Sequence, residues 1–300
     1  MAKKKGRPPV DLHAKILGIP AHTEPLSPEA ESPIRHYRKA VETNFVLINY
    51  INDHMGTGSH YPAIKAKHMG HLRRLVLGNV IETFERFIKE LAAVCIDQLS
   101  PFVVDDRYNT FTAKGNEIIA HFEAGSIGKA LCESDTWLNN ETINARFRRL
   151  LAPSGDEPWD ESLLPARSHG KAMTDEARER RARAGTLALL WQIRHTLAHN
   201  SGVLTGSDSM KLKVLSRRPV ESGRTLAPTE EDLRYVKRFL TATADDINQR
   251  VGKQLAVLLT AVHVESPSLI NPEAKARQLA NIFDIPTKVA TAHAEPIVTA

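Results

Sequence analysis

One stretch of the sequence, from Leu72 to Leu99, constrains the fold more than any other. Apolar residues recur along it every three or four positions, which is the period of one face of an α-helix. They are Leu72, Val76, Val80, Phe84, Phe87, Leu91 and Cys95. Glu82 with Arg86 and Glu85 with Lys89 form favourable pairs four residues apart, which predicts a polar face turned to solvent. Such a helix requires other long helices to cover its apolar side.

Further segments show the same period or the signals of helix ends. We expect helices over residues 33–53 and 174–200, shorter helices within 116–150, and a last long helix over 229–262. Pro33 suits the first turn of a helix that Ser32 precedes. Thr174 is a suitable N-cap, and Thr229 with Asp232 resembles a capping box.

Two short stretches favour β-structure instead. Met210 to Ser216 alternates apolar and polar side chains, which predicts a strand, and Gly223 to Pro228 is its expected hairpin partner. Residues 152–172 have no sustained period and are expected to form an exposed loop that Trp159 holds to the surface. The predicted fold is therefore mainly α: an antiparallel bundle of about four core helices, with an extra N-terminal helix and a small β-hairpin insertion.

The two ends of the chain lack the pattern of a core. Residues 1–32 are basic and rich in proline, which predicts a disordered tail. The helical domain is expected to cover residues 33–262, with its core at about 72–262. Residues 263–300 are expected to form a C-terminal tail with one weak helix, around Pro272 to Phe283.

Composition excludes several classes of protein. The 300 residues, 42% of them hydrophobic, fit a soluble globular chain. Cys95 and Cys132 lack the paired spacing of a zinc site, and no secretory signal is evident, so a reducing cytoplasm is the expected location. No window is apolar enough to span a bilayer, so we expect no membrane partner. The basic stretches 146–149 and 178–183 suit either RNA or a solvated helix face.

The helix expected to end at Asn200 carries a polar cluster in its last two turns. Its apolar stripe is formed by Leu187, Leu190, Ile193 and Leu197. Between and beyond these residues lie Arg194, His195, His199 and Asn200. Chance alone is expected to produce one Arg and His pair at this spacing, so the position at the end of a core-facing helix is what gives the pair weight. A second "IRH", at residues 34–36, has no histidine at the corresponding later position.

Arginine and histidine are the two residue types that RNA cleavage without a metal requires. The 2′-OH attacks the neighbouring phosphate, which needs proton transfer near neutral pH and stabilisation of added negative charge. We expect His199 to be the general acid or base and Arg194 to hold the scissile phosphate. His195 shares a helix face with His199 and is expected to contact substrate or support the site. Asn200 is expected to orient His199 or bind a phosphate or base.

The stretch "RHTLAHN", residues 194–200, resembles the signature of HEPN domains, which are helical ribonuclease and RNA-binding modules. The resemblance implies a bundle of about four helices with the motif at the end of the third. It also implies RNA as the substrate, no cofactor, and a homodimer in which two motifs form one composite active site. A toxin or antiphage-defence effector, restrained by an antitoxin or another regulatory protein, is the biological role that follows.

Three alternatives remain open. The chain fits a non-catalytic RNA-binding or protein-interaction module, such as an antitoxin or a scaffold. His195 and His199 also have the spacing of two zinc ligands, although Thr196 stands where a metalloprotease carries glutamate and no third ligand is evident. Finally, "KKKGRPP" at residues 3–9 is similar to an AT-hook, a segment that binds the minor groove of DNA.

Overall fold

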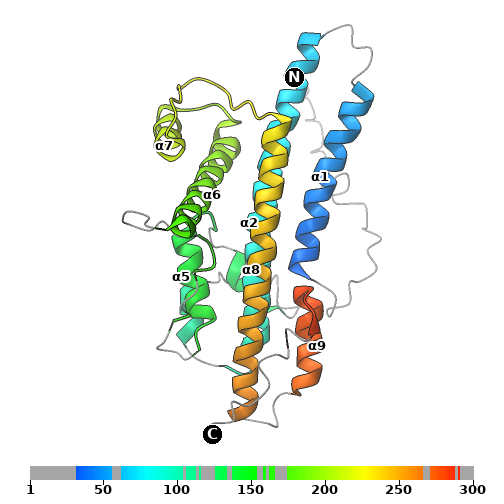
Figure 1. Ribbon diagram of the computed structural model, residues 1–300, viewed down its shortest axis with the longest axis vertical. Coiled ribbons are helices and arrows are strands. Elements are labelled where there is room, and N and C mark those ends of the chain that lie inside the picture. The colour runs from blue at the N-terminus through cyan, green and yellow to red at the C-terminus, as the bar shows by residue number, and fades with distance from the viewer. Residues whose placement is uncertain are drawn as a thin grey trace, which may run out of the picture.

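The computed structural model shows a bundle of long helices with α2 at its centre (Figure 1). It describes residues 32–55, 62–103, 106–112, 115, 126–133, 137–153, 158–159, 162–165, 174–265, 271–287 and 290. The helices are α1 (Pro33–Met55), α2 (Pro62–Leu99), α4 (Ile127–Glu133), α5 (Asn140–Leu150), α6 (Asp175–Asn200), α7 (Gly206–Ser216), α8 (Glu230–Glu265) and α9 (Pro272–Phe283). A short 3₁₀ helix, η2 (Asp106–Thr110), lies between α2 and α4 in the chain. The expectation of a mainly α protein is confirmed.

Helix α2 packs against α1, α4, α5, α6 and α8. It begins at Pro62, earlier than the sequence pattern indicated, and ends at Leu99 as expected. Its second half is buried around most of its circumference, because neighbours cover it on several sides; the buried apolar residues there include Phe84, Phe87, Ile88, Leu91, Ala92, Ala93, Cys95, Ile96 and Leu99. Phe84 contacts Tyr37 of α1 and stacks on Trp191 of α6, so this ring joins three helices.

Helix α4 approaches α2 closely enough that only glycine fits at the contact. A Cβ atom on Gly128 would lie 2.0 Å from the carbonyl oxygen of Ala93, well inside van der Waals contact. Asp97 fixes the same contact by accepting hydrogen bonds from the Gly128 backbone N–H at 2.7 Å and from Ser126 Oγ at 2.6 Å.

The C-terminal helix α9 belongs to the core. It contacts α8 and α1 (Figure 1), and Phe283 is fully buried. The Asn248 side chain of α8 donates a hydrogen bond to the Phe283 carbonyl. Asp284 pairs with Arg35 at 2.9 Å and with Arg38 at 2.8 Å, both from α1. The helix predicted here is thus present with its expected bounds, and it is packed on the bundle rather than attached as part of a loose tail.

The predicted β-hairpin is wrong. Met210 to Ser216 lie within α7, and the described residues contain no strand, only an isolated antiparallel bridge between Val203 and Thr225. The reason lies before the alternating stretch, where Thr205 and Asp208 form a reciprocal capping box that starts a helix. The capping box predicted at Thr229 and Asp232 is confirmed at the start of α8.

The basic stretch at residues 146–149 is used within the protein. The Arg146 guanidinium lies 4.7 Å from the centre of the Trp137 ring, and Arg148 Nε donates to the Trp159 carbonyl at 3.1 Å. Arg149 pairs with Asp106. Trp159 is buried, as expected for the residue that anchors its loop. Structural contacts therefore account for these arginines.

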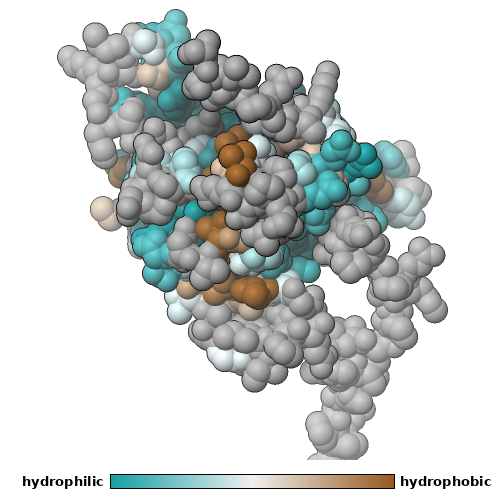
Figure 2. Space-filling view, turned by 90° about the horizontal axis from the view of Figure 1, so that it is seen from below, coloured by the Kyte–Doolittle hydropathy of each residue, from teal (hydrophilic) through white to brown (hydrophobic). Residues whose placement is uncertain are grey.

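The residues 1–31, with the basic segment "KKKGRPP", and residues 291–300 lie outside the described part of the chain. Among the helices that are described, none has a stretch both long and apolar enough to cross a membrane. Figure 2 views the molecule from the lower end of Figure 1, where apolar groups lie between polar ones.

Gly128→Ala is expected to destabilise the fold by about 1–3 kcal/mol, because the added methyl group collides with backbone and not with a movable side chain. Gly185→Ala is the matched control, since this glycine of α6 has open space where a Cβ would stand. It should raise stability by up to about 1 kcal/mol through helix propensity. Urea denaturation of both variants measures the difference, and equal effects would contradict the close α2–α4 contact.

Candidate functional site

Helix α6 has well-defined ends, which fix where its polar cluster lies. The Thr174 side chain accepts a hydrogen bond from the Ala177 N–H at 3.2 Å, as expected for the N-cap. The helix ends at Asn200, and Ser201 and Gly202 follow with positive φ angles of 51° and 83°. Gly202 is packed under Arg74 of α2, where a Cβ would lie 2.9 Å from Arg74 Cδ. The last turn of α6 is therefore held against α2.

Arg194 is directed toward α2. Its guanidinium lies 3.2 Å from the Glu85 carboxylate, and its side chain keeps 23% of its surface exposed. Glu85 is only 7% exposed and also lies 3.6 Å from Lys89 Nζ. The predicted Glu85–Lys89 pair is thus present, but Glu85 is on a buried face rather than in solvent. The cause is that α6 covers this part of α2.

His195 and His199 lie on the exposed side of α6. Their ring centres are 4.6 Å apart, and the ring planes are inclined by 49°. A separation of five residues turns Arg194 and His199 about 140° apart around an ideal helix. Arg194 accordingly faces α2, whereas the two histidine rings form an exposed pair near the end of α6.

The Asn200 side chain is hydrogen-bonded to α7. Its side-chain Nδ2 donates to Asp208 Oδ2 at 2.9 Å, and Gln192 Nε2 donates to Asp208 Oδ1 at 2.9 Å. Asp208 also accepts from the Thr205 backbone N–H and hydroxyl, at 3.2 and 2.7 Å. One carboxylate thus joins the last two turns of α6 to the start of α7. Asn200 holds this connection, and its expected roles of orienting His199 or binding a phosphate or base stay predictions.

The electrostatics of Asp208 follow from these contacts. Burial by itself would raise the pKa of the carboxyl, but hydrogen bonds from Thr205, Asn200 and Thr196 outweigh it and lower the pKa below its ordinary value. The ionised form is therefore the one that the fold stabilises.

A zinc site at the histidine pair has no further support. Among the described residues, no group of three or more His, Cys, Asp and Glu side chains is arranged to hold a metal ion. His195 and His199 therefore lack a third protein ligand within that part of the chain.

Two residues of this site were not predicted from the sequence. Glu85 is four residues after Ile81 and three before Ile88, and both isoleucines are fully buried. Helical spacing therefore predicts that Glu85 lies on the buried side of α2. Asp208 is three residues after Thr205, which is the spacing of a capping box. Because a strand was expected at Met210 to Ser216, the capping box before it was not recognised as the start of a helix.

Comparisons of the chain with models of protein families, with curated proteins and with solved structures gave no match. The geometry of the site is therefore the ground for a functional proposal.

Asp208→Asn is expected to lower the free energy of unfolding at pH 7 by about 2 kcal/mol, because several hydrogen bonds lose their charged acceptor. The native pKa of Asp208 is below that of the unfolded chain, which is about 3.9. Its stabilisation is thus complete above that value and is lost as pH falls through the lower native pKa. Urea titrations at pH 7 and near pH 3 should show the difference between wild type and variant shrinking. A constant difference would rule out this role of the charge.

Proposed function

We propose that the protein is a metal-independent endoribonuclease of the HEPN type that acts as a toxin or antiphage-defence effector. The observation that carries the proposal is the geometry at the end of α6. An exposed histidine pair, with ring centres 4.6 Å apart, lies on the same two helical turns as an arginine that a buried carboxylate holds. The local resemblance of residues 194–200 to HEPN domains supports the same reading.

The proposed reaction needs only groups that the site contains. The 2′-oxygen of the RNA attacks phosphorus, its proton passes to a base, and the P–O5′ bond breaks as an acid protonates the leaving 5′-oxygen. His199 is exposed and suited to one of these proton transfers. Arg194 stabilises the extra negative charge on the phosphate oxygens. The products would be a 2′,3′-cyclic phosphate and a free 5′-hydroxyl.

The contacts of Arg194 suit this role. A guanidinium has five N–H donors, and an ion pair with one carboxylate leaves others for phosphate. Glu85 fixes the position of the group, which lowers the entropy lost when a phosphate binds. Lys89 adds a second positive charge beside the same carboxylate, so the three side chains together carry a net positive charge that attracts the RNA backbone.

The resemblance to HEPN domains implies a homodimer, and the chemistry suits one, because two copies of His199 would supply the two proton carriers in one composite site. The segment that follows the motif has apolar side chains in solvent that suit such an interface. Met210 and Val214 lie on one face of α7 and are 72% and 74% exposed, and Val203 is 43% exposed. An antitoxin or regulatory protein is a second partner for this surface.

Arg194→Ala and His199→Ala are each expected to reduce RNA cleavage about 10²–10⁴-fold, because each removes a group that acts in the transition state. Cleavage by the wild type should continue in EDTA and yield 2′,3′-cyclic phosphate ends, detected by gel mobility before and after phosphatase treatment. Expression of the wild type, but of neither variant, should slow growth of the host.

His36→Ala is the control, since it lies in the second "IRH" of the sequence, on α1, and should leave cleavage unchanged. Equal cleavage by wild type, Arg194→Ala and His199→Ala would contradict the catalytic proposal. RNA binding without cleavage by all three would instead identify a non-catalytic RNA-binding module.

Val214→Lys is expected to convert a dimer into a monomer and to reduce cleavage, because it places a charge in the proposed apolar interface. Val264→Lys, on α8, is the matched control: this valine is 73% exposed, against 74% for Val214, and lies far along the chain from the motif. Size-exclusion chromatography with light scattering measures the mass. A wild-type monomer that cleaves RNA would disprove the composite site.

A further inference from the structure

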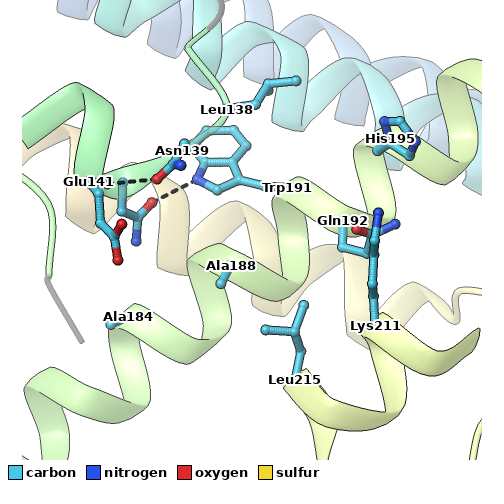
Figure 3. A pocket seen from close by; sticks show the side chains of 11 residues that line it. Leu138, Asn139, Glu141, Ala184, Ala188, Trp191, Gln192, His195, Lys211 and Leu215 are labelled. Atoms are coloured by element: carbon cyan, nitrogen blue, oxygen red, sulfur yellow. Dashed lines mark hydrogen bonds between the residues drawn. The ribbon is translucent and has the colours of Figure 1, made fainter. Parts of the chain in front are cut away.

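A pocket of about 530 Å³ opens beside the histidine pair, between α5, α6 and α7. Figure 3 shows Glu141 of α5 on one side, Lys211 and Leu215 of α7 on another, and the residues of α6 between them. The volume is within the range of protein sites for small ligands or single groups of larger ones. None of the roles assigned above uses this pocket.

The pocket and the histidine pair share one face of α6. Ala184, Ala188, Gln192 and His195 line the pocket, and these positions are spaced by three or four residues along the helix. His199 is the next residue of the series and contacts His195. A chain whose phosphate lies at His199 therefore has the pocket within reach of an adjacent nucleotide.

The lining has the chemistry of a site for a flat, partly polar ring. Trp191 supplies an aromatic wall, which is fixed because its indole N–H donates to Asn140 at 2.7 Å and its ring stacks on Phe84. The small side chains of Ala184 and Ala188 leave space along α6, as Figure 3 shows. Leu138 and Leu215 add apolar surface.

Polar groups at the rim of the pocket can form hydrogen bonds with the edge of such a ring. Glu141 offers a carboxylate that accepts hydrogen bonds. The Asn139 oxygen is already used, since it accepts from the Glu141 N–H at 2.9 Å, but the donor half of its amide is not engaged by that bond. Lys211 is exposed and supplies a positive charge beside the pocket for a phosphate.

We propose that this pocket binds one unpaired base of single-stranded RNA, next to the phosphate on which His199 acts. The proposal rests on the proposed ribonuclease function and adds a source of sequence preference to it. Because an ionised Glu141 only accepts hydrogen bonds, the pocket favours bases with an exocyclic amino group, which offers two N–H donors where uracil offers only its N3–H. Adenine, cytosine and guanine carry such an amino group, and uracil does not.

Binding is measured apart from catalysis, in a His199→Ala background that leaves RNA intact. The probes are fluorescent uridine decamers with one central adenosine, cytidine or guanosine, and an all-uridine decamer. Ala188→Leu fills the pocket and should weaken binding of the preferred decamer about 10-fold, since the bound base loses its contacts with the pocket. Ala182→Leu, at an exposed position of the same helix, should change binding less than about 2-fold.

Two further variants distinguish preference for particular bases from general affinity for RNA. Glu141→Gln should reduce the preference for the amino-bearing bases over uracil. Lys211→Gln should weaken all four decamers alike, whereas Lys213→Gln, also exposed on α7 but not lining the pocket, should not. Thermal unfolding followed by circular dichroism checks that each variant folds.

The outcomes distinguish this inference from the function on which it rests. Two results overturn the base pocket. One is that the His199→Ala protein binds all decamers equally, whether or not it also carries Ala188→Leu. The other is that it binds none of them. Cleavage by the wild type together with either result leaves the ribonuclease proposal intact. Absence of cleavage together with binding that depends on Ala188 overturns the nuclease and retains the pocket as a base site.

Discussion

The burial of α2 on several faces at once is the constraint on which the rest of the structure depends. A helix that is covered by α1, α4, α6 and α8 must meet each neighbour with a different set of side chains. Gly128 of α4 and Gly202 after α6 mark the places where the approach is so close that a larger residue would collide. Phe84 joins α1 and α6 across the same helix. The position of every other long helix is fixed relative to this one.

The candidate site is a consequence of that packing. A carboxylate at Glu85 is costly to bury alone, and Arg194 and Lys89 compensate for it at 3.2 and 3.6 Å. The compensation also decides the direction of Arg194, since a guanidinium held by α2 cannot turn freely into solvent. The histidines, on the other side of α6, are left exposed. One helix thus contributes to the core and to the proposed active site, with Arg194 on the side that faces α2 and the histidines on the exposed side.

Periodicity predicted the long helices α1, α6 and α8 well, because each has an apolar stripe and a side-chain signal at the start. Ser32, Thr174 and the Thr229–Asp232 pair all stand at observed helix starts. The strand at Met210 to Ser216 failed because alternation over so few residues cannot distinguish a strand from a helix, whereas the capping box before it can. Helical spacing places Glu85 beside the buried Ile81 and Ile88, but its partner Arg194 is more than a hundred residues away in sequence, so the ion pair between them could not be predicted.

Arg194, His195, His199 and Asn200 were proposed from sequence as a group, but the directions of their side chains could not be predicted. A linear motif specifies spacing along a helix and not which neighbours cover it. Only tertiary packing separates Arg194 from the histidines and commits the Asn200 amide to Asp208. The pocket beside His195 is even harder to predict from the sequence, because its walls come from three helices, α5, α6 and α7.

The Asp208 carboxylate, finally, makes the end of α6 and the start of α7 one cooperative unit. Because Gln192 and Asn200 of α6 both donate to it, α7 cannot detach without breaking both hydrogen bonds. Local unfolding at this corner would therefore remove a wall of the pocket and loosen the last turn of α6 in the same event. A regulatory protein that binds α7 would therefore change both the pocket and the last turn of α6 without contacting a histidine.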